Sequence, residues 1–259
     1  MKVENKKIVV TGAGAGIGRE LVQMLLKKGA SVIAVDINEK NLQDLKKTYN
    51  KDQLLIAVLD VTDEMKVKEF RDFYIEKLKE IDILINNAGI IQPFVPVNDL
   101  EMDIINRVMN VNFYGPLYLT KAFLPELLKR EEAHIVNVSS MGGFFPFPGQ
   151  TIYGSSKAAL KLFTEGLYAE LLDTNVNVTI VFPGAIATDI MKNSNVEMKE
   201  TSENNFKPLP VDRAATQIIK GIEQNKFQLY VGSDAKMMNF MYKFNAKKAI
   251  QFVKSKMSI

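Results

Sequence analysis

Short apolar runs alternate with longer amphipathic stretches along most of the chain. The runs span residues 6–10, 31–35, 54–59, 81–85, 134–138, 176–182 and 227–231. Each is rich in Val, Ile and Leu at consecutive positions, which is typical of strands covered by helices on both faces. Helical stretches of crossover length lie between them, among them residues 17–28, 39–49, 63–79, 102–130 and 151–173. This order predicts an α/β fold, a doubly wound parallel sheet of about seven strands.

The sequence between these elements contains no segment that would separate two domains. No linker rich in Pro, Gly or Ser, no low-complexity tract and no internal repeat interrupts residues 1–234. A chain of 259 residues can bury one large core, so we expect a single domain over 1–234. Residues 235–259 form a separate tail, because they hold six lysines and no acidic residue.

The charge of the whole chain hides this asymmetry. Residues 1–234 hold 27 basic and 30 acidic residues, a net charge of −3, and the tail adds +6 to reach the total of +3. The net charge of +3 is too small to imply a nucleic-acid partner, so we expect none. No apolar run approaches the roughly 20 residues of a membrane-spanning helix, and the first residues lack the layout of a signal peptide. We therefore expect a cytoplasmic protein.

The tail predicts one basic amphipathic helix. On a helical wheel Lys236, Lys243, Lys247 and Lys254 fall on one side. The opposite side is apolar and holds Met238, Met241, Tyr242, Ala249, Phe252 and Val253. The favoured interpretation is that this side docks on the body or on a neighbouring subunit. The alternative is weak contact with an anionic membrane surface, which would make the protein peripheral there.

The composition narrows the chemistry further. The chain has no cysteine, which excludes disulfides, thiolate nucleophiles and cysteine-bearing zinc sites, and we predict no metal site. It has one histidine, His134, so proton transfer near neutral pH must use that residue or a tuned side chain of another type. His134 opens a strand, far from the strand's carboxyl end. We interpret it as a surface or packing residue.

A glycine-rich turn follows the first strand and leads into a helix. Gly12, Gly14, Gly16 and Gly18 would let the backbone approach a pyrophosphate at the positive end of that helix. Asp36 ends the second strand 18 residues after Gly18, near the spacing of an acid that binds ribose hydroxyls. A carboxylate there repels a 2′-phosphate, which favours NAD(H) over NADP(H). The alternative for Asp36 is a helix N-cap, which Asn38 could serve equally well.

A tyrosine and a lysine lie one helical turn apart, at Tyr153 and Lys157. A neighbouring ammonium favours the phenolate, so we expect Lys157 to lower the pKa of Tyr153 from its usual value of about 10. Ser140 ends a strand 13 residues before Tyr153 and supplies a hydroxyl. The competing residue, Ser139, should face the other way because strand side chains alternate.

These motifs together resemble the short-chain dehydrogenase/reductase family. The other motifs that carry the resemblance are Asp60-Val61, Asn86-Asn87-Ala88-Gly89, Asn112, and Pro183-Gly184 with Thr188. The match runs in order and spacing from about residue 6 to residue 232. It implies a single-domain Rossmann fold and NAD(P)-dependent hydride transfer between a secondary alcohol and a ketone. It also implies a homotetramer or homodimer built through the helices near residues 112–130 and 151–173.

The resemblance assigns a role to each catalytic position. Tyr153 would exchange the proton with the substrate oxygen, Ser140 would hydrogen-bond that oxygen, and Lys157 would bind the nicotinamide ribose. Asn112 would hold a water in a proton relay. The implied cofactor-binding residues are Gly12, Ala15, Gly16, Ile17, Gly18, Asp36, Ile37, Asp60, Val61, Asn87, Ala88, Gly89, Tyr153, Lys157, Pro183, Gly184, Ile186 and Thr188.

Two loops rich in Pro and aromatic residues, 91–96 and 144–148, follow strands and predict an apolar substrate wall. The alternative is that their aromatics only pack the loops down. The candidate pocket residues are Gln92, Phe94, Ser140, Met141, Phe144, Phe145, Gln150, Ile190 and Met191. Nearly all are apolar, so we expect a hydrophobic ketone or secondary alcohol as substrate. Residues 189–210 are polar and without periodicity, which predicts a lid or a disordered loop.

Two rival functions stay open at this point. One is an NADP(H)-dependent carbonyl reductase, which Asp36 disfavours. The other is a non-catalytic dinucleotide sensor, which would keep the glycine turn but would not need Ser140, Tyr153, Lys157 and Asn112 together. Neither the natural substrate nor the direction of the reaction follows from the sequence.

Overall fold

A seven-stranded, all-parallel sheet forms the centre of the protein. The computed structural model describes residues 1–49, 52–194, 196 and 207–255. The strands are β1 (Lys7–Thr11), β2 (Ser31–Asp36), β3 (Leu54–Val58), β4 (Ile83–Asn86), β5 (Ala133–Val138), β6 (Val176–Pro183) and β7 (Gln228–Val231). Their order is β3-β2-β1-β4-β5-β6-β7. This confirms the predicted doubly wound fold, and every strand lies within two residues of its predicted bounds.

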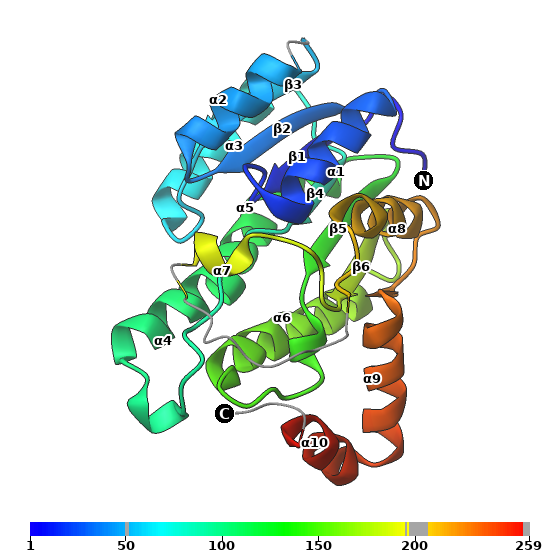
Figure 1. Cartoon of the computed structure of the whole chain (residues 1–259). Helices are drawn as coiled ribbons and strands as arrows, with labels where there is room; N and C mark the ends of the chain where they lie inside the picture. Colours follow the sequence, from blue (N-terminus) through cyan, green and yellow to red (C-terminus); the bar gives the residue numbers. More distant parts are fainter. Residues whose placement is uncertain (50–51, 195, 197–206, 256–259) are drawn as a thin grey trace.

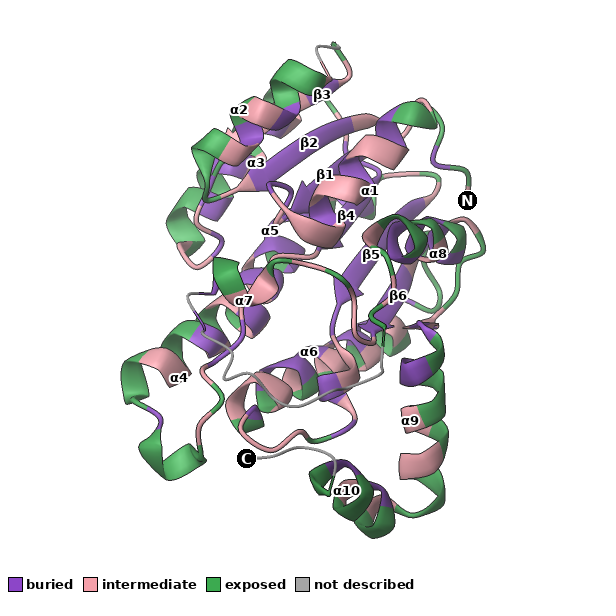
Figure 2. Cartoon of the chain, in the orientation of Figure 1, coloured by how far each residue is buried: buried purple, intermediate pink, exposed green. Residues whose placement is uncertain are grey.

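Helices cover both faces of the sheet (Figure 1). One face is packed by α1 (Gly16–Lys27), α2 (Glu39–Thr48) and α8 (Val211–Glu223), and the other by α3 (Glu64–Leu78), α5 (Gly115–Leu127) and α6 (Thr151–Glu170). Successive strand residues point to opposite faces, so Ile8 and Val10 enter the first core and Val9 enters the second. Both cores bury their strand residues (Figure 2), which explains why the strand sequences are apolar throughout.

The stretch 102–130, predicted as one helix, is interrupted in the middle. It comprises α4 (Met102–Met109), the π-helical turn η2 (Asn110–Tyr114) and α5. Pro116 supplies the physical reason, because proline has no N–H and cannot donate to the carbonyl four residues earlier, that of Asn112. The turn widens at this point and leaves Asn112 fully buried.

The long segment 189–210 is described only in part. It begins with α7 (Ile190–Asn193), and Leu209 pairs with Ile186 in an isolated β-bridge. Residues 195 and 197–206, on which most of the predicted lid falls, lie outside the described residues. Among the described residues, no helix combines the length and apolar character that crossing a bilayer requires.

The tail forms two helices, so the predicted single helix is wrong. They are α9 (Ser233–Phe244) and α10 (Ala246–Lys254). Asn245 between them has an extended backbone, and its side chain accepts a hydrogen bond from the Lys248 N–H at 3.0 Å. Asparagine is a strong N-cap residue, so it starts a new helix there. The inner sides of both helices pack on the aromatic loop that follows β5, as the favoured interpretation expected, but Phe252, which was predicted on that side, is exposed.

His134 is a packing residue and is fully buried at the start of β5. Its Nε2 lies 2.7 Å from the Thr179 hydroxyl, which donates its only hydrogen to the Lys226 carbonyl at 2.6 Å. The imidazole must therefore carry its proton on Nε2, and Nδ1 has no partner among the described residues. Burial, with the positive N-terminus as a smaller cause, lowers the pKa of His134 to about 3.

This pKa predicts a loss of stability in mild acid. In the unfolded chain the histidine takes up a proton below about pH 6.5, whereas in the folded chain it stays neutral until about pH 3. The contribution of the neutral His134 to the free energy of unfolding is therefore fully present above pH 6.5. It is lost as the pH falls, with a slope of up to about 1.4 kcal/mol per pH unit. Urea unfolding at about pH 7, 6 and 5 measures this slope. In His134→Gln the slope should nearly disappear, and equal slopes in both proteins would contradict the assignment.

Candidate active site

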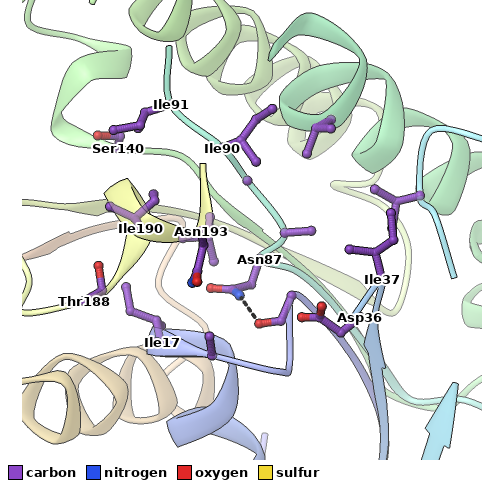
Figure 3. A pocket seen from close by; sticks show the side chains of 18 of the residues that line it. Ile17, Asp36, Ile37, Asn87, Ile90, Ile91, Ser140, Thr188, Ile190 and Asn193 are labelled. Carbon is purple, nitrogen blue, oxygen red and sulfur yellow. Dashed lines mark hydrogen bonds between the residues drawn. The ribbon is translucent and has the colours of Figure 1, made fainter. Parts of the chain in front are cut away.

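A cleft of about 1080 Å³ opens where the carboxyl ends of the central strands meet. The chain leaves β1 and β4, which are neighbours, for helices on opposite faces of the sheet, and such a switch point is the usual ligand site of this architecture. Asp36 and Ile37 lie at one end of the cleft and Ser140, Ile90 and Ile91 at the other (Figure 3). The cleft can hold an elongated ligand with two chemically different ends.

The glycine turn forms the floor of the cleft. Gly12 and Gly16 have φ values of 65° and 51°, a left-handed conformation that favours glycine. Gly18 does not line the cleft but makes the turn possible, because a Cβ there would lie 2.1 Å from the Gly12 carbonyl oxygen. The helix that follows, α1, begins at Gly16, and its N-cap residue Ala15 makes no capping bond, so its first N–H groups are available to an anion.

Polar contacts fix the turn to the loop after β4. The Asn87 side chain donates to the carbonyl of Thr11 at 2.9 Å and to that of Gly12 at 3.3 Å. Figure 3 marks one hydrogen bond from this side chain. The Thr11 hydroxyl accepts from the backbone N–H groups of Asn87 and Ala88 at 3.0 and 3.1 Å. These bonds hold the two loops at a fixed separation, which gives a bound ligand two rigid walls.

Asp36 reaches the cleft from the end of β2. Its two carboxylate oxygens accept hydrogen bonds from the N–H groups of Gly14 at 2.8 Å and Asn38 at 2.9 Å. Asn38, and not Asp36, is the N-cap of α2, because it accepts from the Asn41 N–H at 3.1 Å. The carboxylate keeps lone pairs free for further donors, as a pair of ribose hydroxyls would supply.

Of the predicted cofactor residues, all but Gly18 line the cleft. Asp60 and Val61 come from the turn after β3, where the Asp60 carboxylate accepts from the Thr62 N–H and hydroxyl at 2.9 and 2.7 Å. Pro183, Gly184, Ile186 and Thr188 follow β6 and close the opposite side. The cofactor-binding residues that the motifs predict therefore lie around one cleft, although they come from distant parts of the sequence.

Three of the four predicted catalytic residues line the cleft. Tyr153 and Lys157 project from the first turns of α6, and Ser140 lies at the end of β5. The Ser140 hydroxyl oxygen accepts from the Gly142 N–H at 3.0 Å, and the Lys157 ammonium donates to the Val138 carbonyl at 2.9 Å. Ser139 donates its hydroxyl to the Lys157 carbonyl at 2.9 Å, so Ser140 is the serine with a hydroxyl left for a substrate.

Burial controls the charge of the tyrosine and lysine pair. It raises the pKa of the Tyr153 phenol above its ordinary value, and the Ser140 hydroxyl offsets part of the rise. It lowers the pKa of Lys157 to about 8. The expectation that Lys157 lowers the tyrosine pKa is wrong for this structure, because burial is the largest cause acting on the pKa of the phenol and only the Ser140 hydroxyl opposes it. At neutral pH the phenol is a proton donor.

Asn112 lies behind the cleft wall. Its amide oxygen accepts from the Ile90 N–H at 2.9 Å, and its amide nitrogen donates to the Ile90 carbonyl at 2.9 Å and to the Ser156 hydroxyl at 3.0 Å. The side chain therefore connects the loop after β4, η2 and α6. A relay water would have to use another atom of the residue, and the carbonyl of Asn112 is the one that Pro116 leaves without its helical donor.

The structure corrects most of the predicted substrate wall. Ser140, Ile190 and Met191 line the cleft, whereas Gln92, Phe94, Met141, Phe144, Phe145 and Gln150 do not, within the part of the chain that is described. Phe145 is fully buried against Tyr242 of the tail, with ring centroids 5.6 Å apart. Phe144 packs edge-on against Phe182 and Tyr230, and Met141 joins the same group of side chains as the tail. These aromatics pack their loop down, and Phe94 is exposed at the surface.

Gln92 and Gln150 build the start of the helix that carries Tyr153. The buried Gln92 amide oxygen accepts from the N–H groups of Ile152 at 2.8 Å and Tyr153 at 2.9 Å, and its nitrogen donates to the Gly149 carbonyl at 3.0 Å. Gln150 donates to the Gln92 carbonyl at 2.7 Å. Since Gln150, the N-cap residue, makes no capping bond itself, Gln92 caps α6 from a distant loop.

Gln92→Leu should therefore reduce both stability and turnover. It leaves two N–H groups and one carbonyl without partners, which should cost about 2 kcal/mol or more of unfolding free energy. A shifted first turn also moves Tyr153, so kcat should fall while the affinity for NADH stays the same. Urea unfolding, steady-state kinetics and NADH titration check this, with Gln43→Leu on the exposed side of α2 as the control. Equal kcat in both variants would contradict the positioning role.

Several residues of the cleft escaped the sequence reasoning. Ile90 and Ile91 extend the apolar end directly after the predicted Gly89. Lys192 and Asn193 reach the cleft from α7. A polar stripe of α4 and η2 lines one rim with Asp103, Asn106, Arg107 and Asn110. Their i, i+3, i+4, i+7 spacing could have predicted this rim from the sequence, because polar residues that share one helix face must contact solvent or a ligand.

Comparison with known sequences agrees with this geometry. The family profile described as short chain dehydrogenase matches residues 6–199. An uncharacterised oxidoreductase of Staphylococcus saprophyticus is 32% identical over 237 residues, which cover 88% of this chain and 96% of the relative. The 3-oxoacyl-[acyl-carrier-protein] reductase of Thermotoga maritima is 36% identical over 204 residues, covering 78% and 82%.

Solved structures give the same result for the fold. A short chain dehydrogenase from Burkholderia cenocepacia in complex with NADP superimposes with a TM-score of 0.83 at 27% identity, over 98% of this chain and 99% of the other. A 3-ketoacyl-(acyl-carrier-protein) reductase from Brucella melitensis complexed with NADH gives 0.80 at 25% identity, over 90% and 99%. Neighbours in structure thus bind either dinucleotide.

Proposed function

Since the chain belongs to the short-chain dehydrogenase/reductase family, we propose that it is an NAD(H)-dependent oxidoreductase that interconverts a secondary alcohol and a ketone on a hydrophobic substrate. The observation that carries the proposal is the position of Ser140, Tyr153 and Lys157 on one wall of a cleft whose floor is the glycine turn. A dinucleotide sensor without catalysis would have no use for this wall.

Each of the four catalytic residues has its own role in transferring the proton to the substrate. In the reductive direction the neutral Tyr153 phenol donates its proton to the carbonyl oxygen, and the Ser140 hydroxyl donates a hydrogen bond to the same oxygen. Lys157 binds the ribose beside the reacting ring and stabilises the phenolate that remains. The Asn112 carbonyl would hold the water that returns a proton to this pair. The dinucleotide, when bound, supplies or accepts the hydride.

The surroundings of Asp36 support NAD(H) as the cofactor. Its carboxylate would repel a 2′-phosphate, and the cleft residues beside it, Val35, Ile37, Asn38 and Asn41, carry no positive charge to attract one. Steady-state kinetics with both reduced cofactors test the preference. We expect kcat/KM to be at least about tenfold higher with NADH, a difference of about 1.4 kcal/mol in transition-state binding. A preference for NADPH would favour the rival carbonyl reductase.

The end of the cleft near Ser140 supports a hydrophobic substrate. Ile90, Ile91, Ile190 and Met191 line it. Such a wall discriminates weakly between homologues, by roughly 1–3 kcal/mol per methylene, so several lipophilic ketones should react. A panel of lipophilic ketones and small sugars, followed by NADH absorbance, tests the substrate class. Faster turnover of the sugars would exclude this substrate class.

We also propose that the protein is a homotetramer or homodimer built through α5 and α6. Two large exposed side chains support this: in the single chain Tyr114, which directly precedes α5, is 40% exposed and Leu162 of α6 is 70% exposed. Sedimentation velocity measures the mass in solution, and a monomer at micromolar concentration would contradict the proposal.

A further inference from the structure

The outer face of the tail helices carries large apolar side chains that the body of the protein does not cover. In α9, Met237, Phe240 and Phe244 are 48%, 71% and 86% exposed, and Phe252 of α10 is 46% exposed. The first three share one side of the helix, at i, i+3 and i+7. We call Met237, Phe240, Phe244 and Phe252 the outer apolar face; Figure 2 shows the exposed sides of both helices in green.

This face is distinct from the one that holds the tail in place. Met238, Met241 and Tyr242 of α9, with Ala249 and Val253 of α10, pack around the buried Phe145. The two helices therefore have an inner apolar side that is satisfied within the chain and an outer one that is not. Because the inner side anchors both helices, the outer apolar face is presented by a fixed support.

Exposed lysines lie on the same two helices as the outer apolar face. Lys236, Lys243, Lys247, Lys248 and Lys254 are all exposed, and none of them forms an ion pair within the described residues. Residues 235–259 contain no acidic residue, and the rest of the chain has a net charge of −3. The positive charge of the protein is thus concentrated beside its most exposed aromatic side chains.

We propose that the outer apolar face docks on an anionic lipid surface. Phenylalanine and methionine side chains can enter the boundary between headgroups and acyl chains while lysines on the same helix reach the phosphates. Lysines near an anionic bilayer are attracted to its negative surface. Exposed aromatic side chains and exposed lysines on the same two helices are typical of a segment that lies at a membrane surface.

The charges argue against a second copy of the chain as the occupant. Two copies that met through the same face would be related by a twofold axis, so the lysines of one copy would lie opposite those of the other. Such like charges repel each other at an interface. A bilayer that carries negative headgroups complements both the aromatic strip and the lysines.

Vesicle co-sedimentation of the full chain tests the proposal. We expect binding to vesicles of phosphatidylcholine with phosphatidylglycerol, weak binding to phosphatidylcholine alone, and a decline with added salt. The double variant Phe240→Ser with Phe244→Ser should lower the partition coefficient at least about tenfold. Lys243→Glu with Lys247→Glu should lower binding to the anionic vesicles to a similar degree.

Matched variants on the body provide the controls. Phe73→Ser removes an aromatic side chain that is 56% exposed on α3, and Lys40→Glu with Lys46→Glu makes the same charge change on exposed positions of α2. Both should bind vesicles like the unaltered protein apart from the general effect of charge. Thermal unfolding confirms that every variant is folded.

The outcomes separate the lipid surface from its alternatives. No binding of the unaltered protein to anionic vesicles, or equal losses in the tail and body variants, would overturn the proposal. A change of mass in sedimentation velocity for Phe240→Ser with Phe244→Ser, without a change in vesicle binding, would assign the face to a second copy and overturn it as well. Because binding is measured without substrate, failure here leaves the proposed catalytic function untouched.

Discussion

Replacing Tyr153 with phenylalanine is expected to lower kcat by about 10²–10⁴-fold, the usual contribution of a positioned general acid. The phenol is the proton donor on the catalytic wall, and burial keeps it protonated at neutral pH. We expect the ring to stay in place in the variant, because phenylalanine keeps the ring and Gln92 still accepts from the backbone N–H of residue 153. The loss should therefore appear in kcat and not in the affinity for NADH.

Steady-state kinetics and NADH titration check both parts of this expectation. Tyr118→Phe in α5 removes a hydroxyl from a half-buried tyrosine outside the cleft lining and should retain normal turnover. If Tyr153→Phe reduced the substrate as fast as the Tyr118 control, proton donation would have to come from another group. With only one histidine in the chain, buried at the far end of β5, that group could not be an imidazole.

Gly18→Ala is expected to weaken dinucleotide binding at least about tenfold, or about 1.4 kcal/mol. A methyl group at this position would lie 2.1 Å from the Gly12 carbonyl oxygen and 2.6 Å from the Asn87 amide nitrogen. Since the carbonyl belongs to the turn and the amide to the loop after β4 that is hydrogen-bonded to it, the backbone must move and the two walls of the cleft must separate. The affinity for NADH, measured by calorimetric titration, reports that movement.

Gly166→Ala is the matched control for this substitution. Gly166 lies in α6, and a methyl group there would meet nothing within 4 Å. Alanine also stabilises a helix interior by about 0.5–1 kcal/mol relative to glycine, so this variant should bind NADH normally and unfold at a slightly higher temperature. Equal NADH affinity in both variants would show that the turn does not form the cofactor site.

The fold and the outline of the cleft could be predicted because their signals are local. A strand buried on both faces must be apolar at every position, and Val9 beside Val10 shows this within two residues. The glycine turn could be predicted because position 12 has a left-handed backbone and position 18 has no room for a Cβ, and glycine meets both requirements. The Tyr153 and Lys157 pair is readable because helical spacing alone places both on one wall.

The features that escaped prediction depend on contacts between distant parts of the chain. Gln92 looks like a pocket residue by its place in a loop, yet its partners lie about 60 positions later in α6. Phe144 and Phe145 follow a strand as substrate loops do, but they are covered by a tail that the local sequence cannot place. The rise in the pKa of Tyr153 likewise depends on burial, which tertiary structure decides.

The tail was wrongly predicted as one helix for a different reason. Asparagine is a common N-cap residue, so Asn245 could have indicated from the sequence that a new helix begins there. The helical wheel that placed the lysines on one side instead treated the tail as one continuous helix. Two shorter helices can each turn a separate side toward the body. This is why Phe240 and Phe244, which one continuous wheel did not single out, remain on the surface.

Isotope transfer tests the central claim most directly, that this cleft moves a hydride from NADH to a ketone with Tyr153 as the proton donor. The protein is incubated with NADH that carries deuterium at both hydrogens of the reactive carbon and with the best ketone of the substrate panel, and the alcohol is examined by mass spectrometry. The account predicts one deuterium on the carbinol carbon, formed at least about 10²-fold more slowly by Tyr153→Phe. An alcohol without deuterium, or equal rates in both proteins, would contradict it.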